Sequence, residues 1–138
     1  MLQKFVSAAV LLMLFAEAQS QVVKSTALEH LAEMEKTIAL DARVLRQLRD
    51  PKNNPTLLTR DQNVRYLQLI EKSNATFGDN PLSPQGACVK VFWYSHEAWQ
   101  SKVAYEKSSS NFDRDRLARW QKMLSSENEA CRFYLGKT

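Results

Sequence analysis

Apolar residues recur at helical spacing along most of this chain, and the pattern predicts an all-α fold. The clearest stripe repeats every seven residues with companion positions between the repeats: Leu31, Met34, Ile38, Leu45 and Leu48. Thr26 and Glu29 fit a capping box before this stripe, and Pro51 follows its end. A first helix is therefore expected over residues 26–49.

One polar residue falls within this first stripe. Asp41 occupies a position that the repeat assigns to the core. Either Asp41 is a core carboxylate paired with another side chain, or a small rotation of the helix puts Ala42 in its place. We favour the rotation.

A second helix is expected over residues 59–73, after a loop rich in Pro and Asn. Thr59 and Gln62 fit another capping box, and one face carries apolar residues: Val64, Leu67 and Ile70. The run at residues 58–62 (LTRDQ) resembles the LTxxQ motif of periplasmic stress chaperones of the Spy and CpxP type. The tandem copy of the motif is missing, so we assign no family.

A third helix is expected over residues 84–107, after a linker that contains two glycines and two prolines (SNATFGDNPLSPQG). Ser83 is its expected cap and Pro84 its first residue. Residues 89–94 are β-prone, but the helical stripe continues beyond them through Ser95, Ala98, Trp99 and Val103. The linker also contains a glycosylation sequon at Asn74, which has meaning only in a eukaryotic source.

A fourth helix is expected over residues 112–135, with Gly136 as its stop. Its apolar face carries Leu117, Trp120, Leu124 and Cys131. We expect the third and fourth helices to form an antiparallel hairpin that turns near residues 109–110. The whole protein is then an all-α, four-helix, bundle-like arrangement.

Cys88 and Cys131 are the only cysteines, and they lie at the same height on this hairpin. Trp99 and Trp120 are level as well. The hairpin therefore predicts a disulfide at its open end and a Trp pair near its middle. The disulfide would stabilise the fold by about 4 kcal/mol in the chain-entropy model. Two free buried cysteines are the alternative.

The N-terminal residues 1–20 have the pattern of an export signal. Lys4 precedes an apolar stretch at residues 5–16, and small residues follow at Ala16, Ala18 and Ser20. Cleavage after Ala18 or after Ser20 fits equally well. The stretch is shorter than the roughly 20 residues that span a bilayer, which disfavours a membrane anchor. We expect a secreted or periplasmic protein whose single helical domain covers residues 21–138, in a compartment where disulfides persist.

The charge of the chain limits the classes of partner that it can bind. The net charge is +4, and the basic residues are interspersed with acidic ones. Such a chain favours acidic partners over nucleic acid, which needs a concentrated basic patch.

Motifs for catalysis are incomplete. Residues 96–100 (HEAWQ) stop one residue short of the zinc motif HExxH, because Gln100 replaces the second ligand. His30 and His96 are the only histidines, and no GxSxG elbow is present. We predict no catalytic, cofactor or metal site. An unrecognised metal-dependent or hydrolytic enzyme is the alternative class.

Two aromatic residues point away from the seam of the hairpin, Trp93 by about 160° and Phe133 by about 180°. We expect the first two helices to cover both. If they are exposed instead, they form a partner-binding patch with Lys90 and Arg132. The leading hypothesis is therefore non-enzymatic binding of another exported protein, as a periplasmic inhibitor, immunity protein or chaperone-like protein. In a eukaryotic source the same features suit a secreted helical ligand or carrier.

Overall fold

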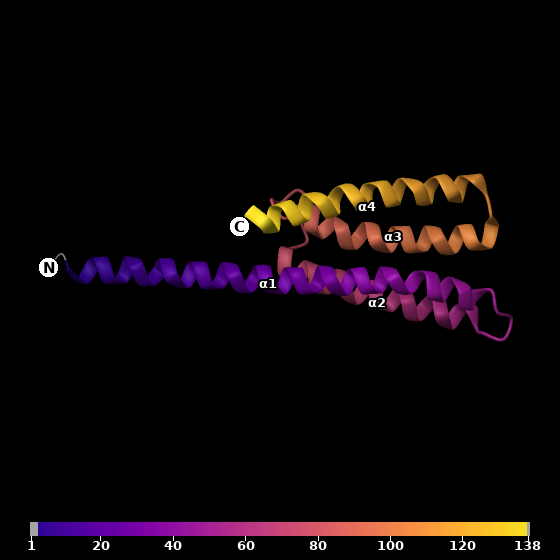
Figure 1. The fold of residues 1–138 in the computed structure, drawn as a ribbon, viewed down its shortest axis with the longest axis horizontal. Coiled ribbons are helices and arrows are strands. Elements are labelled where there is room, and N and C mark those ends of the chain that lie inside the picture. Colours follow the sequence, from indigo (N-terminus) through magenta and orange to yellow (C-terminus); the bar gives the residue numbers. More distant parts are fainter. Residues whose placement is uncertain (1–2, 138) are drawn as a thin grey trace.

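A computed structural model describes the backbone of residues 3–137 and the side chains of residues 23–136. Its four helices are α1 (Gln3–Leu48), α2 (Pro55–Phe77), α3 (Gly86–Ser108) and α4 (Asn111–Lys137). Figure 1 shows two antiparallel hairpins, α1–α2 and α3–α4, that lie along one another. The predicted all-α, four-helix fold is confirmed. The expected signal peptide, residues 1–20, lies outside the residues whose side chains are described.

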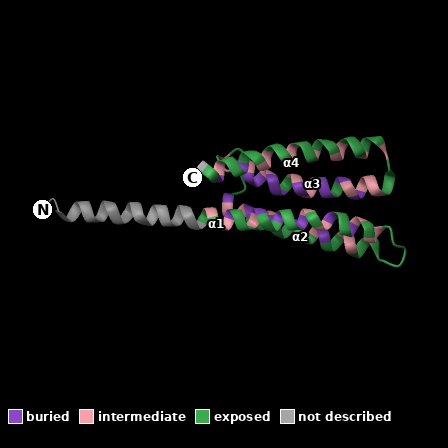
Figure 2. Cartoon of the chain, in the orientation of Figure 1, coloured by how far each residue is buried: buried purple, intermediate pink, exposed green. Residues whose placement is uncertain are grey.

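Helix α3 is the centre of the core. Its buried residues cover a broad side of the helix and include Cys88, Val89, Phe92, Ser95, Ala98 and Trp99. It packs against all three other helices, whereas α4 packs mainly against α3. Figure 2 accordingly shows buried positions concentrated on α3 and exposed positions along α4. The predicted helix through residues 89–94 is confirmed, and no strand forms there.

The hairpin of α3 and α4 is closed by the predicted disulfide between Cys88 and Cys131, whose Cα atoms lie 4.6 Å apart. At the other end the chain turns at Ser109, as expected. Ser109 adopts the left-handed conformation with φ of 50°, and its N–H donates to the Tyr105 carbonyl at 2.8 Å. The left-handed residue ends α3 and lets α4 begin after one further residue.

The predicted pairing of the two tryptophans is wrong. Trp99 turns towards α2, where it stacks on Tyr66 with ring centroids 6.4 Å apart and donates from Nε1 to Asn63 at 2.9 Å. Trp120 instead packs on Tyr94, with centroids 5.4 Å apart. The register of the hairpin was predicted correctly, but the direction of Trp99 follows α2, which the hairpin geometry alone does not include.

Helix α2 begins four residues earlier than predicted. Asn54 is the N-cap and accepts hydrogen bonds from the N–H groups of Thr56 and Leu57, while Pro55 is the first helical residue. Thr59 therefore lies inside the helix, and its hydroxyl donates to the Pro55 carbonyl at 2.8 Å. The expected capping box at Thr59 is wrong because Asn54 and Pro55 supply a stronger start signal.

The buried face of α2 also differs from the prediction. Val64 and Leu67 are exposed, and Ile70 is only partly buried. The buried face is made by Gln62, Tyr66, Leu69, Ser73 and Phe77. Two of these residues are polar, so a search for apolar spacing selects the wrong face.

The start of α3 depends on a close approach of the chain to itself. Its N-cap is Gln85 and its first residue is Gly86, not Ser83 and Pro84 as expected. A Cβ atom on residue 86 would lie 1.9 Å from the Pro81 carbonyl oxygen. Only glycine fits there. At the far end of the chain, α4 continues through Gly136, so the expected stop is wrong.

Candidate functional site

Trp93 and Phe133 are both exposed, by 52% and 62%. The expectation that α1 and α2 cover them is wrong. The buried residues of α3 occupy one broad side of that helix, and Trp93 lies on the remaining stripe with the exposed Gln100. Phe133 lies on the outer side of α4, which packs mainly against α3. Both side chains are therefore accessible from solvent, and the partner-binding patch stays a prediction.

Trp93 borders a groove of about 370 Å³ between α3 and the loop that precedes it. Its lining residues are Asp79, Pro81, Leu82, Val89, Lys90, Trp93 and Tyr94. Leu82 is 89% exposed, an unusual position for a large apolar side chain. One feature of the sequence indicates this second wall, an isolated Leu between two prolines in a polar linker, and helical periodicity does not detect it.

The two cations of the expected patch are already paired. Lys90 Nζ lies 3.3 Å from Glu127 Oε1, across the α3–α4 seam. Arg132 of α4 pairs with Glu35 of α1. Of the four expected residues, Trp93 and Lys90 line the groove, whereas Phe133 and Arg132 lie outside it on α4. The groove therefore offers apolar surface more than charge.

A buried network of polar side chains lies inside the fold, centred on Asp41. Asp41 is only 2% exposed and accepts hydrogen bonds from two other helices. Gln62 Nε2 lies 2.8 Å from Oδ1, and the Tyr66 hydroxyl lies 3.0 Å from both carboxylate oxygens. Lys102 Nζ of α3 lies 2.6 Å from Oδ2. Asp41 is thus a paired core carboxylate, and the preferred rotation towards Ala42 is wrong because the partners come from α2 and α3.

The donors around Asp41 leave it little capacity for chemistry. Three donors reach the carboxylate: the Gln62 amide at Oδ1, the Lys102 ammonium at Oδ2, and the Tyr66 hydroxyl, whose single proton is shared between the two oxygens. Burial and the negative charge of Asp41 raise the pKa of the Tyr66 phenol far above its usual range, so Tyr66 stays protonated. The network joins three helices and acts as a cross-link.

His30 and His96 each interact with a different polar side chain. His30 Nδ1 lies 3.2 Å from the Thr76 hydroxyl, and His96 Nε2 lies 3.1 Å from Gln100 Nε2. Burial lowers the pKa of His96, which packs beside the Tyr66 ring at 5.8 Å. Among the residues whose side chains are described, no group of three or more His, Cys, Asp or Glu residues is placed to hold a metal ion.

The described part of the chain also contains no helix with the length and apolar character needed to cross a membrane. Comparison with protein-family models, with curated proteins and with solved structures finds no match to this chain.

Proposed function

We propose that this protein is exported and acts by non-enzymatic binding of another exported protein, through the groove beside Trp93. The observation that supports the proposal is the half-exposed Trp93 facing a groove whose other wall carries the almost fully exposed Leu82. Tryptophan in a partly enclosed apolar setting is the residue type that contributes most to protein–protein affinity.

The shape and chemistry of the groove suit an apolar side chain of the partner. A volume of about 370 Å³ is enough for one or two large side chains, and Pro81, Leu82, Val89 and Trp93 supply apolar walls. Lys90 is compensated by Glu127, so the groove does not require a charged group. The net charge of +4 favours approach of an acidic protein. The partner is therefore an acidic exported protein with an apolar anchor residue.

Export is supported by two features. The disulfide between Cys88 and Cys131 is typical of proteins in oxidising compartments, and residues 1–20 have the pattern of an export signal. The inhibitor, immunity-protein and chaperone-like hypotheses all use a surface of this kind, and so does a secreted ligand or carrier.

The test is capture of partners by the purified, disulfide-bonded protein from the secreted or periplasmic fraction of its source, with identification by mass spectrometry. We expect Trp93→Ala to reduce affinity for the captured protein at least about tenfold, because the anchor loses its main contact. Circular dichroism should remain unchanged, since Trp93 is half exposed.

Phe112→Ala is the matched control. Phe112 is also a highly exposed aromatic residue, but it lies at the start of α4, away from the disulfide. Phe133→Ala then tests whether the surface extends onto α4. Equal binding by the wild type and Trp93→Ala, or equal loss with Phe112→Ala, would reject the groove as the binding surface.

A further inference from the structure

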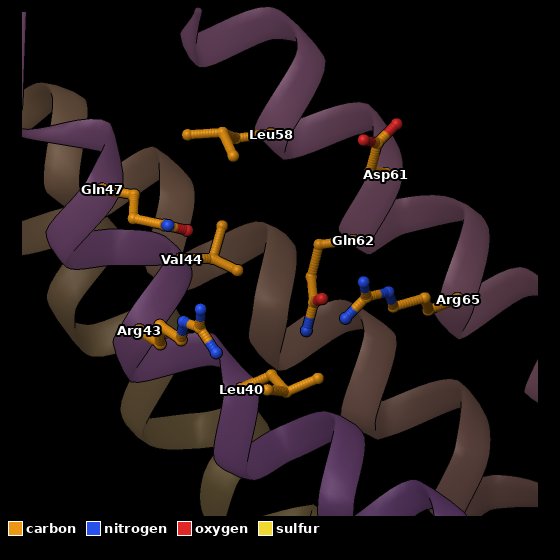
Figure 3. A pocket seen from close by; sticks show the side chains of 8 residues that line it. All are labelled: Leu40, Arg43, Val44, Gln47, Leu58, Asp61, Gln62 and Arg65. Carbon is orange, nitrogen blue, oxygen red and sulfur yellow. The ribbon is translucent and has the colours of Figure 1, made fainter. Parts of the chain in front are cut away.

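A cavity of about 210 Å³ lies between α1 and α2, away from the groove at Trp93. Figure 3 shows Arg43 and Gln47 of α1 and Gln62 and Arg65 of α2 pointing into the space between the helices. Asp61 and three apolar side chains complete the lining: Leu40, Val44 and Leu58. The cavity therefore combines polar side chains from both helices with an apolar surface.

Two positive charges in this cavity are not compensated by the protein. Within the described residues, neither Arg43 nor Arg65 makes an ion pair. Asp61 is the one acid in the lining, and it already interacts with Arg60 at 3.5 Å. Two guanidinium groups that border one cavity whose single acid interacts with another arginine favour an anion, and their planar donor geometry suits a carboxylate.

A buried hydrogen-bond acceptor beside the cavity indicates that a bound molecule would also carry a hydrogen-bond donor. Gln62 is 1% exposed, and its Nε2 donates to the Thr37 carbonyl at 3.0 Å and to Asp41 at 2.8 Å. Both of those partners can only accept, so the orientation of the amide is fixed. Gln62 Oε1 therefore faces the other way, and it has no donor among the described residues. An unpaired buried acceptor is costly unless a donor reaches it.

We propose that the α1–α2 cavity binds an apolar carboxylate that carries an N–H or O–H donor next to its carboxyl group. The carboxylate pairs with Arg43 and Arg65, the donor reaches Gln62 Oε1, and the apolar side chain packs on Val44 and Leu58. Because Oε1 is buried, the ligand reaches it by displacing the exposed side chain of Arg65, which points towards Gln62 in Figure 3.

Two kinds of molecule carry a carboxylate, a neighbouring N–H donor and an apolar side chain: a free N-acylated amino acid and the C-terminal residue of a peptide. The test is calorimetric titration of the purified, disulfide-bonded protein with N-acetyl-L-leucine and with a short peptide that ends in a free leucine carboxylate. We expect saturable binding at one site per chain. The corresponding N-acetyl-L-leucinamide should bind at least about tenfold more weakly, because it lacks the charge that pairs with the guanidinium groups. Tighter binding of the peptide assigns the site to chain ends, and equal binding assigns it to the free acid.

Arg43→Gln and Arg65→Gln should each weaken binding of the acid at least about tenfold without loss of folding, because both side chains are exposed. Arg46→Gln is the matched control, an exposed arginine on α1 outside the cavity. Trp93→Ala should leave this binding unchanged, which separates the site from the proposed protein-binding groove. Absence of saturable binding at millimolar probe, or equal binding of the acid and its amide, would overturn the proposal.

Discussion

The two hairpins of this protein are held together by different means. In α1–α2, polar side chains cross-link the helices, and α2 supplies a buried face that extends from Gln62 to Phe77. In α3–α4, the outer helix supplies few buried side chains, chiefly Cys131 and Leu135, and the disulfide ties it to α3. A helix that buries little apolar surface gains little from the hydrophobic effect, so a covalent tie is more important for α4 than for α2.

This difference means that separate conditions control the two hairpins. Reduction of the Cys88–Cys131 bond acts on α4, whereas the attachment of α2 to α1 depends on the hydrogen bonds that Gln62 and the protonated Tyr66 donate to Asp41. Perturbing one hairpin and observing the other tests whether the two are held independently.

The largest expected effect is the loss of the disulfide. The double substitution Cys88→Ser and Cys131→Ser should lower the free energy of unfolding by up to about 4 kcal/mol in the chain-entropy model. Hydrogen exchange should show the earliest loss of protection in α4, while the amides of α1 and α2 remain protected. Uniform loss of protection over all helices would show that α4 is as firmly packed as α2.

An intermediate effect is expected for Tyr66→Phe. Removal of the hydroxyl leaves Asp41 with Gln62 and Lys102, and should cost about 1–2 kcal/mol at neutral pH. The variant should also remove an alkaline instability. The folded state keeps the Tyr66 proton, whereas the unfolded chain loses it near a pH of about 10, so stability falls as pH rises above that value.

Urea unfolding across the alkaline range measures this effect. Tyr105→Phe is the control because Tyr105 does not contact Asp41, and it should keep the alkaline loss of stability. A wild-type protein whose stability does not change above a pH of about 10 would contradict the role given to Tyr66.

The smallest effect is expected on the surface of the α1–α2 hairpin. Lys72 Nζ pairs with Glu33 at 2.8 Å, and both side chains are about half exposed. Lys72→Gln should change the free energy of unfolding by less than about 1 kcal/mol, and high salt should remove the difference. A larger loss would mean that exposed ion pairs, and not the Asp41 network, hold α2 to α1.

Contacts between helices that follow one another directly in the chain, such as α3 and α4, were predictable from the sequence. The hairpin and its disulfide follow from the spacing of Cys88 and Cys131 around a short turn, and the stripe on α1 follows from its seven-residue repeat. The arrangement of α2 was not predictable in the same way. Its buried face includes Gln62, whose amide donates to Thr37 and Asp41 of α1, and the hydrophobic pattern assigns such a polar residue to the surface.

Contacts between distant parts of the chain also limited the prediction of the Asp41 network and of the surface around Trp93. Asp41 is buried only because Gln62, Tyr66 and Lys102 satisfy it, and these residues are far apart in the sequence. The expected coverage of Trp93 by α1 and α2 failed for a related reason, because wheel positions give its direction on α3 but not which helix lies opposite. The burial of Asp41 and the exposure of Trp93 both depend on which residues and helices lie next to them in the folded structure.

A single missing methyl group determines where one wall of the proposed binding groove stands. Because a Cβ at Gly86 would overlap the Pro81 carbonyl, any larger residue would push the Pro81–Leu82 segment away from α3. Position 86 should therefore tolerate little variation, although it is buried and lies outside the lining of the groove. In a selection for altered binding, substitutions at this position would emerge as indirect modulators of the groove.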